Sequence, residues 1–236
     1  MQLSENTVNI LKNFAGINSN LVFKPGQSLS TISEAKTIMA KASIAENFDH
    51  EFGVYDLNEF LSVMNLVDAP VLTFEDKSVL VSNTAGGVKR PNSTKVRYYY
   101  SELDILTQPS KDINMPKCEV SFDLSSDDLD RIKKAAAVLG HTELMFSCDS
   151  GGSPRDSAEV VAKVFDERDA TANTFNITLD TTSTETFDFV FSISNLKMLH
   201  GDYKVSISSR LISNWKNNDI PVEYFIALEK SSSYGV

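Results

Sequence analysis

The sequence is poor in the residues that build disulfide frameworks, zinc sites and nucleophile–base pairs. It has two cysteines, Cys118 and Cys148, and three histidines, His50, His141 and His200, among 236 residues. Two isolated cysteines give neither a disulfide framework nor a metal-ligand spacing. No histidine stands four positions from another ligand type in a helical pattern. We therefore expect reduced, core-filling cysteines and no zinc site.

Long apolar runs and an excess of basic residues are also missing. No segment approaches the roughly 18 apolar residues of a membrane span, and the chain opens on polar residues rather than on a signal peptide. The formal net charge of −10 argues against tight binding of nucleic acid on an open face. It does not exclude a protein that encloses DNA and needs only a locally basic surface. We expect a soluble protein, made where it works, with no membrane partner.

Motifs that carry chemistry are absent as well. We find no phosphate-binding glycine loop, dinucleotide fingerprint or nucleophile elbow. The Gly151–Ser153 stretch precedes Pro154 instead of a helix start, which indicates a loop. Asp127, Asp128 and Asp130 fall at a predicted helix N-terminus, where carboxylates favour the helix dipole. The sequence thus predicts no enzymatic activity, no metal site and no cofactor.

One pattern, a strand that runs into a capped helix, is written twice. In residues 51–66, Phe52 and Val54 alternate, and Asp56 with Glu59 forms a capping box ahead of a helical apolar stripe. Residues 187–199 repeat the pattern without a gap, so that Phe189 aligns with Phe52. We expect a helix in this second copy too.

Two further segments recur in the same order. The predicted helix 3–15, capped by Ser4 and stopped by Gly16, matches a second one after Leu124 that Ser125 caps, and the strand 96–103 matches 222–229. Such repetition indicates two similar domains, at 1–107 and 118–236, with a Pro- and Lys-containing linker at 108–117. The expected fold is α+β, with duplicated strand–helix–strand units. Loops are expected at 85–93 and 149–156.

Five cations gather on the predicted helices, on faces that do not carry the apolar stripe. They are Lys12, Arg131, Lys133, Lys134 and Lys197. If these helices line one concave surface, the cations give it a weak positive lining that is blind to base sequence, since phosphate contacts carry no base information. Each one alone is better explained as a solvated side chain.

Two apolar strands are candidates for sheet edges, which associate with a partner edge when left unpaired. The alternative is that both are interior strands. The candidate contact residues are Tyr98, Tyr99 and Tyr100 on the first strand and Val160, Val161 and Val164 on the second.

Taken together, the motifs resemble a known family. The stretches that carry the likeness are residues 3–19, 54–61 (VYDLNEFL), 195–204 and 224–229 (YFIALE). They are similar to the DNA polymerase sliding clamps of T-even-type tailed bacteriophages, over nearly the whole chain and in order. The likeness is faint between about 82 and 120 and across 149–175.

The resemblance implies a DNA clamp fold, in a homotrimeric ring of six similar domains with helices inside and a continuous antiparallel sheet outside. Such a ring encircles duplex DNA, tethers DNA polymerase, is opened by a clamp-loader ATPase and can assist late transcription. It acts in the cytoplasm of the infected bacterial host. By the same resemblance the five cations face the bore, and the tyrosine and valine strands make the subunit contacts. Glu5 departs from this pattern, because relatives can carry a basic residue there.

The sequence leaves a second functional hypothesis open. A structural virion or scaffold protein could use the same duplicated domains and assemble through its sheet edges without meeting DNA.

Overall fold

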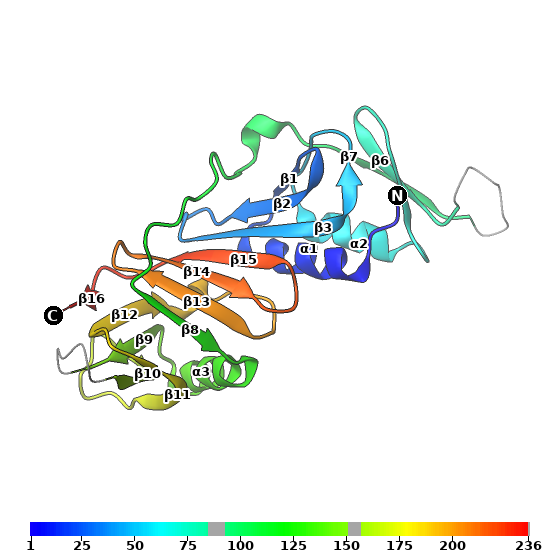
Figure 1. The fold of residues 1–236 in the computed structure, drawn as a ribbon. Helices are drawn as coiled ribbons and strands as arrows, with labels where there is room; N and C mark the ends of the chain where they lie inside the picture. The colour runs from blue at the N-terminus through cyan, green and yellow to red at the C-terminus, as the bar shows by residue number, and fades with distance from the viewer. Residues whose placement is uncertain (85–92, 151–156, 236) are drawn as a thin grey trace. The chain divides into compact units, whose positions relative to one another are not determined.

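The computed structural model describes residues 1–84, 93–150 and 157–235, and it divides into two compact units (Figure 1). The units are Met1–Lys111 and Asp112–Val236. Their boundary falls inside the segment 108–117. The loops predicted at 85–93 and 149–156 lie mostly outside the described residues.

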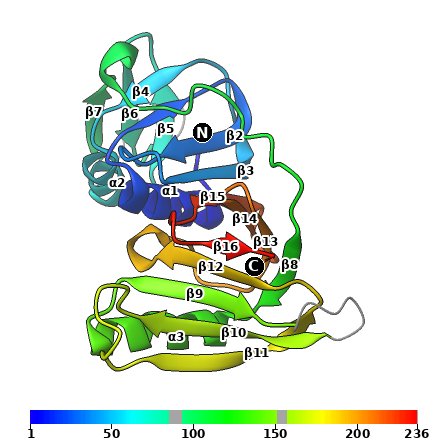
Figure 2. The ribbon, with the colours of Figure 1, turned by 90° about the vertical axis from the view of Figure 1, so that its left-hand side faces the viewer.

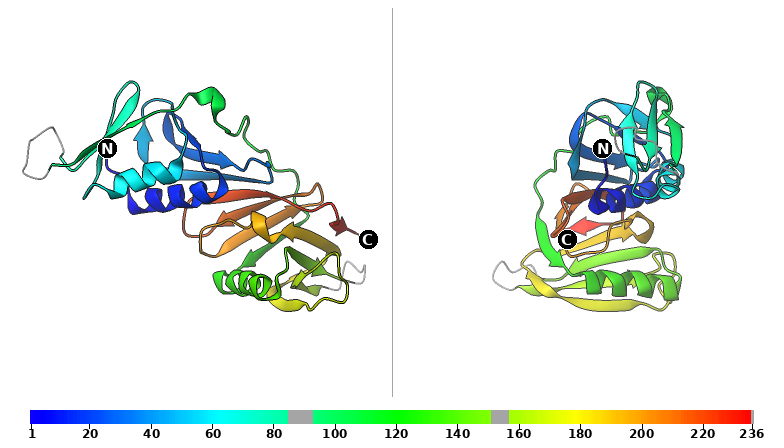
Figure 3. Two further views of the ribbon diagram at one scale, coloured as in Figure 1. Left: turned by 180° about the vertical axis from the view of Figure 1, so that it is seen from behind. Right: turned by 90° about the vertical axis from the view of Figure 1, so that its right-hand side faces the viewer.

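Two helices of the N-terminal unit begin at the caps that the sequence indicates. Helix α1 spans Glu5–Ile17, and its cap Ser4 accepts a hydrogen bond from the backbone N–H of Thr7. Helix α2 spans Leu57–Asn65, and its cap Asp56 accepts one from the N–H of Glu59. The two helices lie side by side (Figure 3).

The strands of the N-terminal unit form three antiparallel groups. Strand β1 pairs with β4, β2 pairs with β3, and β5, β6 and β7 form a three-stranded sheet in that order. A short 3-10 helix, η2, follows. The bounds are β1 Leu21–Phe23, β2 Gly26–Ile32, β3 Ile38–Phe48, β4 Phe52–Val54, β5 Val71–Phe74, β6 Ser78–Ser82, β7 Lys95–Tyr99 and η2 Leu103–Ile105.

Aromatic side chains fill the core of this unit. The rings of Phe23 and Phe52 stack with centroids 4.5 Å apart, and Phe48 and Phe60 meet Phe23 edge-on. All four side chains are buried. Helix α1 covers β2 and β3 with its apolar face and leaves its polar face exposed.

The C-terminal unit consists of two sheets and one α-helix within its described residues. One sheet has the order β11-β10-β9-β12-β16, and β8, β13, β14 and β15 follow one another in the second. Helix α3 packs against β10 and β11 (Figure 2). The bounds are β8 Val120–Leu124, α3 Ser126–Leu139, β9 Glu143–Cys148, β10 Ala158–Phe165, β11 Phe175–Ser183, β12 Phe187–Ser192, the 3-10 helix η3 Ile193–Asn195, β13 Tyr203–Ser208, β14 Ile212–Asn217, β15 Val222–Ala227 and β16 Ser233–Tyr234.

Trp215 centres the core of the C-terminal unit. It is fully buried, and its indole N–H donates to the hydroxyl of Ser213 over 2.9 Å. The rings of Phe146, Phe191 and Tyr203 surround it at 5.7–6.4 Å between centroids. A buried indole with its donor satisfied stabilises the unit without an unpaired polar group.

The pairing pattern confirms the duplication. The antiparallel pair of β1 and β4 corresponds to the pair of β9 and β12, and the pair of β2 and β3 corresponds to that of β10 and β11. The three-stranded set β5-β6-β7 corresponds to the set β13-β14-β15. The aligned tyrosines both bond to the backbone of the connection after β4 or β12, one as donor and the other as acceptor. The Tyr98 hydroxyl donates to the carbonyl of Asp56, and the Tyr224 hydroxyl accepts from the N–H of Leu199.

The helix expected in the second copy of the repeat does not form. Strand β12 leads into the single 3-10 turn η3, whose flanking Ser192 makes no side-chain capping bond. The connection to β13 is residues 193–202, shorter than residues 55–70 in the first copy. Lys197 therefore follows a turn and is not on a helix. Helix α1 also continues one residue past Gly16, where a stop was expected.

A carboxylate from strand β3 anchors the start of α1. Glu46 accepts hydrogen bonds from the backbone N–H of Ser4 and, over 2.5 Å, from the Thr7 hydroxyl. Burial acts to raise the pKa of Glu46, but these bonds outweigh it and leave the pKa below its usual value. The charged carboxylate is thus the form that stabilises the folded unit.

We expect Glu46→Gln to lower the free energy of unfolding by about 1 kcal/mol at pH 7, a modest value because solvent screens the partly exposed carboxylate. The pKa of Glu46 is lower in the folded protein than in the unfolded one. The difference in unfolding free energy between wild type and variant is therefore full above about pH 4.3, and it disappears as the pH falls through the folded pKa. Urea unfolding across pH measures it. Glu34→Gln, an exposed position, is the matched control. A pH-independent difference would contradict the assignment.

Candidate nucleic-acid interface and subunit edges

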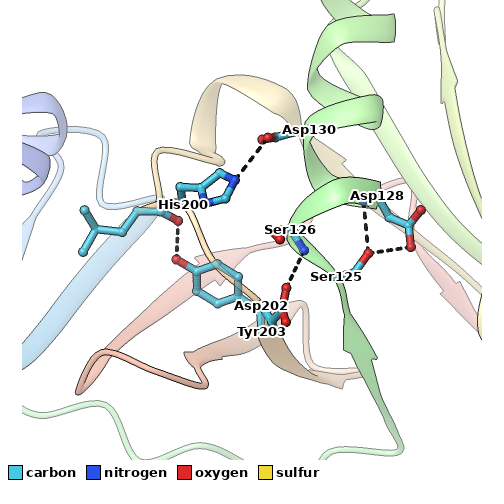
Figure 4. Close-up of polar contacts among 8 residues, drawn as sticks. Ser125, Ser126, Asp128, Asp130, His200, Asp202 and Tyr203 are labelled. Carbon is cyan, nitrogen blue, oxygen red and sulfur yellow. Dashed lines mark hydrogen bonds and ion pairs between the residues drawn. The ribbon is translucent and has the colours of Figure 1, made fainter.

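Two contacts from different parts of the chain fix the start of α3 (Figure 4). The Ser125 hydroxyl accepts from the N–H of Asp128 over 3.1 Å and donates to its carboxylate over 2.8 Å. The carboxylate of Asp202 accepts from the N–H of Ser126 over 2.7 Å, which lowers the pKa of Asp202. These hydrogen bonds hold the first turn of α3 in place.

The segment 196–202 lies beside α3 because His200 contacts it. The ring Nε2 of His200 stands 3.3 Å from the carboxylate of Asp130 (Figure 4). The Tyr203 hydroxyl donates to the carbonyl of Leu199 over 2.6 Å and steadies the same segment. The structure thus brings the stretch that contains Lys197 to the first half of α3 through His200 and Asp202. Sequence reasoning missed His200 and Asp202, because no local pattern links them to a helix so far back in the chain.

The predicted cations of α3 differ in exposure. Arg131 is exposed and forms an ion pair with Asp128 at 3.7 Å, and Lys134 is exposed. Lys133 is half-buried: burial lowers its pKa, and the nearby Asp130 opposes that shift. Lys133 is therefore less exposed than Arg131 and Lys134, and its place on the DNA-facing surface stays a prediction. With three aspartates against these three cations, α3 is neutral overall, with acid at its start and base in its middle.

The helices of the N-terminal unit expose mostly amide and hydroxyl groups. Lys12 is exposed on α1, as the helical pattern predicts, and Asn6 and Asn9 are exposed on the same helix. Helix α2 exposes Asn58 and Asn65. Amide side chains donate hydrogen bonds without adding charge. Glu5 and Glu59 are exposed on these helices as well, so the surface is polar and carries two carboxylates against the one cation Lys12.

Strand β7 is an edge of its sheet within the described residues, as the sequence suggested. Of the three consecutive tyrosines at the end of β7 and just past it, Tyr99 alone is exposed, over 67% of its surface. Tyr98 packs edge-on against Phe60 at 5.3 Å. Tyr100 stacks on Phe52 at 4.8 Å, and burial raises its pKa to about 12.

The second predicted edge strand is an interior strand. Strand β10 pairs with β9 on one side and β11 on the other, so the edge is β11. Val160 and Val164 are buried in the core and Val161 is half-buried. The alternation in sequence reports a half-buried strand but not its place in the sheet order, which is why this prediction failed.

A groove of about 360 Å³ lies between the second half of α3 and the start of β11. Its floor is apolar, and Val138 on its rim is 76% exposed. The lining residues are Arg131, Lys134, Ala135, Val138, Leu139, Thr174 and Phe175.

No group of three or more His, Cys, Asp and Glu side chains converges as metal ligands in the part of the chain that the structure describes. Over the same residues, no helix has the length and apolarity that crossing a membrane requires.

Comparison with known proteins gives a relative along the whole length. The sliding clamp of Vibrio phage KVP40 is 34% identical over 233 residues, covering 97% of this chain and 99% of the relative. The chain belongs to the sliding-clamp family. The sliding clamps of Escherichia phage RB69 and Enterobacteria phage T4 are each 27% identical over 99% of both chains.

Two family descriptions match successive parts of this clamp. Residues 4–85 match the DNA polymerase processivity factor family, and residues 121–230 match the C-terminal part of the gp45 sliding clamp. The protein is therefore a processivity factor of the phage sliding-clamp type, as the sequence motifs indicated.

Solved structures confirm the clamp fold. Proliferating cellular nuclear antigen from Entamoeba histolytica matches with a TM-score of 0.68 at 11% identity over 97% of both chains. The antigen of A. fulgidus, solved with the C-terminal region of FEN-1 bound, matches with a TM-score of 0.68 at 14% identity over 98% of both. At these identities the likeness concerns the fold.

Proposed function

We propose that this clamp works as a homotrimeric ring around duplex DNA, in which the β7 edge of each subunit joins the β11 edge of the next. The observation that carries the proposal is that β7 and β11 each end a sheet within the described residues and each have exposed apolar groups beside them. Such edges are association sites unless something covers them. A head-to-tail contact between unlike edges closes into a ring when its rotation allows.

Side chains beside the two edges support this pairing. Tyr99 is exposed on β7, and Leu66, just past α2, is 70% exposed. The groove at α3 and β11 has an apolar floor. Burying these apolar groups against a second copy is favourable at about 25 cal/mol per Å² before association costs. The contact sites first predicted at Val160 and Val164 shift to the neighbouring β11.

The polar helix faces are the proposed DNA-facing surface. Lys12, Arg131, Lys134 and Lys197 would supply few and partly neutralised phosphate contacts, and Lys133 contributes less because it is half-buried. Phosphate contacts hold DNA without reading its sequence, and each contact changes the logarithmic salt slope by only about −0.9. A weakly attractive bore suits a protein held on DNA by topology and free to slide.

The proposed partners follow from the family. The ring tethers the replicative DNA polymerase, a loader ATPase opens it onto DNA, and it supports late transcription. Its place of action is the cytoplasm of the infected bacterial cell. The role involves no bond making or breaking, so it needs no catalytic residue. The alternative of a virion or scaffold protein has no support from the relatives, which are sliding clamps.

Replacing Lys12, Arg131 and Lys134 together by Gln should reduce processive primer extension several-fold near physiological salt and make the salt slope shallower by up to about 0.9 per lost contact. The assay uses cognate polymerase and loader across a salt series. Lys204, Arg210 and Lys216, exposed cations outside the helices, changed to Gln are the matched control. Equal effects of the two triple variants would show that the helix faces have no special role.

Tyr99→Glu should shift the protein from trimer to monomer at micromolar concentration, because the change places an unpaired charge in the proposed contact. Ala45→Glu is the matched control, since Ala45 is exposed in the same unit on β3, which belongs to a different sheet from β7. Sedimentation velocity distinguishes the species. If Tyr99→Glu sediments like wild type, β7 is not the subunit edge.

A further inference from the structure

The ring of His200 projects from a stretch of backbone that the core of its unit holds in place. The N–H of Leu199 donates to the Tyr224 hydroxyl over 3.1 Å, and the carbonyl of Leu199 accepts from the Tyr203 hydroxyl over 2.6 Å. Both tyrosine side chains are fully buried. Burial raises the pKa of both, that of Tyr203 to about 12, so neither hydroxyl changes charge in the range where histidines titrate.

The two residues after His200 are fixed as well. The carboxylate of Asp202 accepts from the N–H of Ser126 over 2.7 Å. Gly201 has a φ of 150°, and a Cβ on it would stand 2.6 Å from the side-chain amide nitrogen of Asn217. Glycine adopts such a φ without strain. His200 is therefore a side chain on an ordered base, and 71% of that side chain is exposed.

His200 stands beside two carboxylates at the acidic start of α3 (Figure 4). Its ring Nε2 lies 3.3 Å from the carboxylate of Asp130, which is itself 59% exposed. The N–H and hydroxyl of Ser126 and, more weakly, the charge of His200 hold the pKa of Asp202 below its usual value. Lys133 is a second cation near Asp130. Together, the four charged side chains carry one net negative charge when His200 is neutral and none when it is protonated.

We propose that His200 is a further residue of the DNA-facing surface, and that its proton sets how strongly the start of α3 attracts duplex DNA. With a neutral His200, the exposed carboxylates of Asp127 and Asp130 repel phosphate. With a charged His200, the ring offsets this acid and offers a donor to a phosphate oxygen. Lys197, three positions earlier on the same connection, is exposed as well. The inference rests on the proposed function, because it assumes that this connection and the exposed face of α3 meet DNA.

The direction of the pH dependence follows from these charges. Histidine is the side chain that ordinarily changes charge between about pH 5 and 8. Lowering the pH through this range adds a positive charge at the start of α3, so DNA is held more tightly at the lower pH. A nearby phosphate in turn favours the protonated ring. Because the pair with Asp130 is exposed, solvent screens it, and the ring can exchange between Asp130 and a phosphate oxygen.

Duplex binding by the full-length, assembled protein tests the proposal. The anisotropy of a short fluorescent duplex at low salt should show several-fold higher affinity at about pH 5.5 than at about pH 8. In His200→Gln, whose amide still donates to Asp130 but takes no proton, most of this pH response should be lost. Wild type should also show a steeper salt slope at the lower pH, by up to about 0.9 for each histidine that gains a phosphate contact, and the variant should not.

Matched variants separate a charge effect from a structural one. His141→Gln removes the histidine at the other end of α3, whose ring Nε2 contacts the carbonyl of Asn173 over 2.6 Å, and should keep the wild-type pH response. Asp130→Asn should raise the affinity several-fold at about pH 8, because it removes acid without a proton. Asp188→Asn, at an exposed aspartate on β12, should leave the affinity unchanged. If the His200 contact only held the structure together, Asp130→Asn would bind DNA equally or less well.

A wild-type pH response in His200→Gln would overturn the proposal, and so would an Asp130→Asn variant that binds DNA no better than Asp188→Asn at the higher pH. Circular dichroism and sedimentation velocity at both pH values show that each variant folds and assembles. If His200→Gln does not fold, the two aspartate variants decide alone. Either of the first two results leaves the proposed DNA surface standing, whereas a wild-type protein that binds no duplex at either pH removes that surface and this inference with it.

Discussion

A carboxylate from a distant segment holds the first turn of each long helix in this clamp. Glu46 on β3 binds the start of α1, and Asp202 ahead of β13 binds the start of α3. The orphan N–H groups and positive dipole end of a helix make such an anchor favourable. The direction in which each polar face points depends on these contacts, so the proposed DNA surface depends on them as well.

The charges on the individual helices show why an acidic chain can be proposed to lie around DNA. Helix α3 balances three aspartates with three cations, and Arg131 is partly neutralised by Asp128. The exposed faces of α1 and α2 are rich in asparagine. Such a surface attracts phosphate too weakly to hold DNA by itself. Weak phosphate contacts let a protein that is held by topology slide along the duplex.

Much of the fold followed from the sequence because its signals were local. Ser4, Asp56 and Ser125 cap the helices as their spacing predicts, and the apolar periods located most of the strands. The failures had non-local causes. Only a 3-10 turn forms at Ile193–Asn195, because the connection from β12 to β13 is shorter than the one that holds α2. Strand β10 is interior because β9 and β11 pair with its two sides.

The same reason explains what was missed at the site. His200 and Asp202 reach α3 across long sequence separations, and β16 pairs with β12 through only two residues of ladder. Lys133 looked exposed on a helical wheel and is half-buried in the unit. Residue types and spacing predicted that cations lie on these helices, but their exposure depends on packing that a single sequence does not encode.

The central claim is enclosure of DNA, and retention on circular against linear DNA tests it most directly. Protein loaded onto a nicked circle by the cognate loader should stay bound through a high-salt wash and should be released when one restriction cut linearises the circle, since salt weakens phosphate contacts but not a topological link. Equal retention on circular and cut DNA, or equal loss from both, would contradict the account.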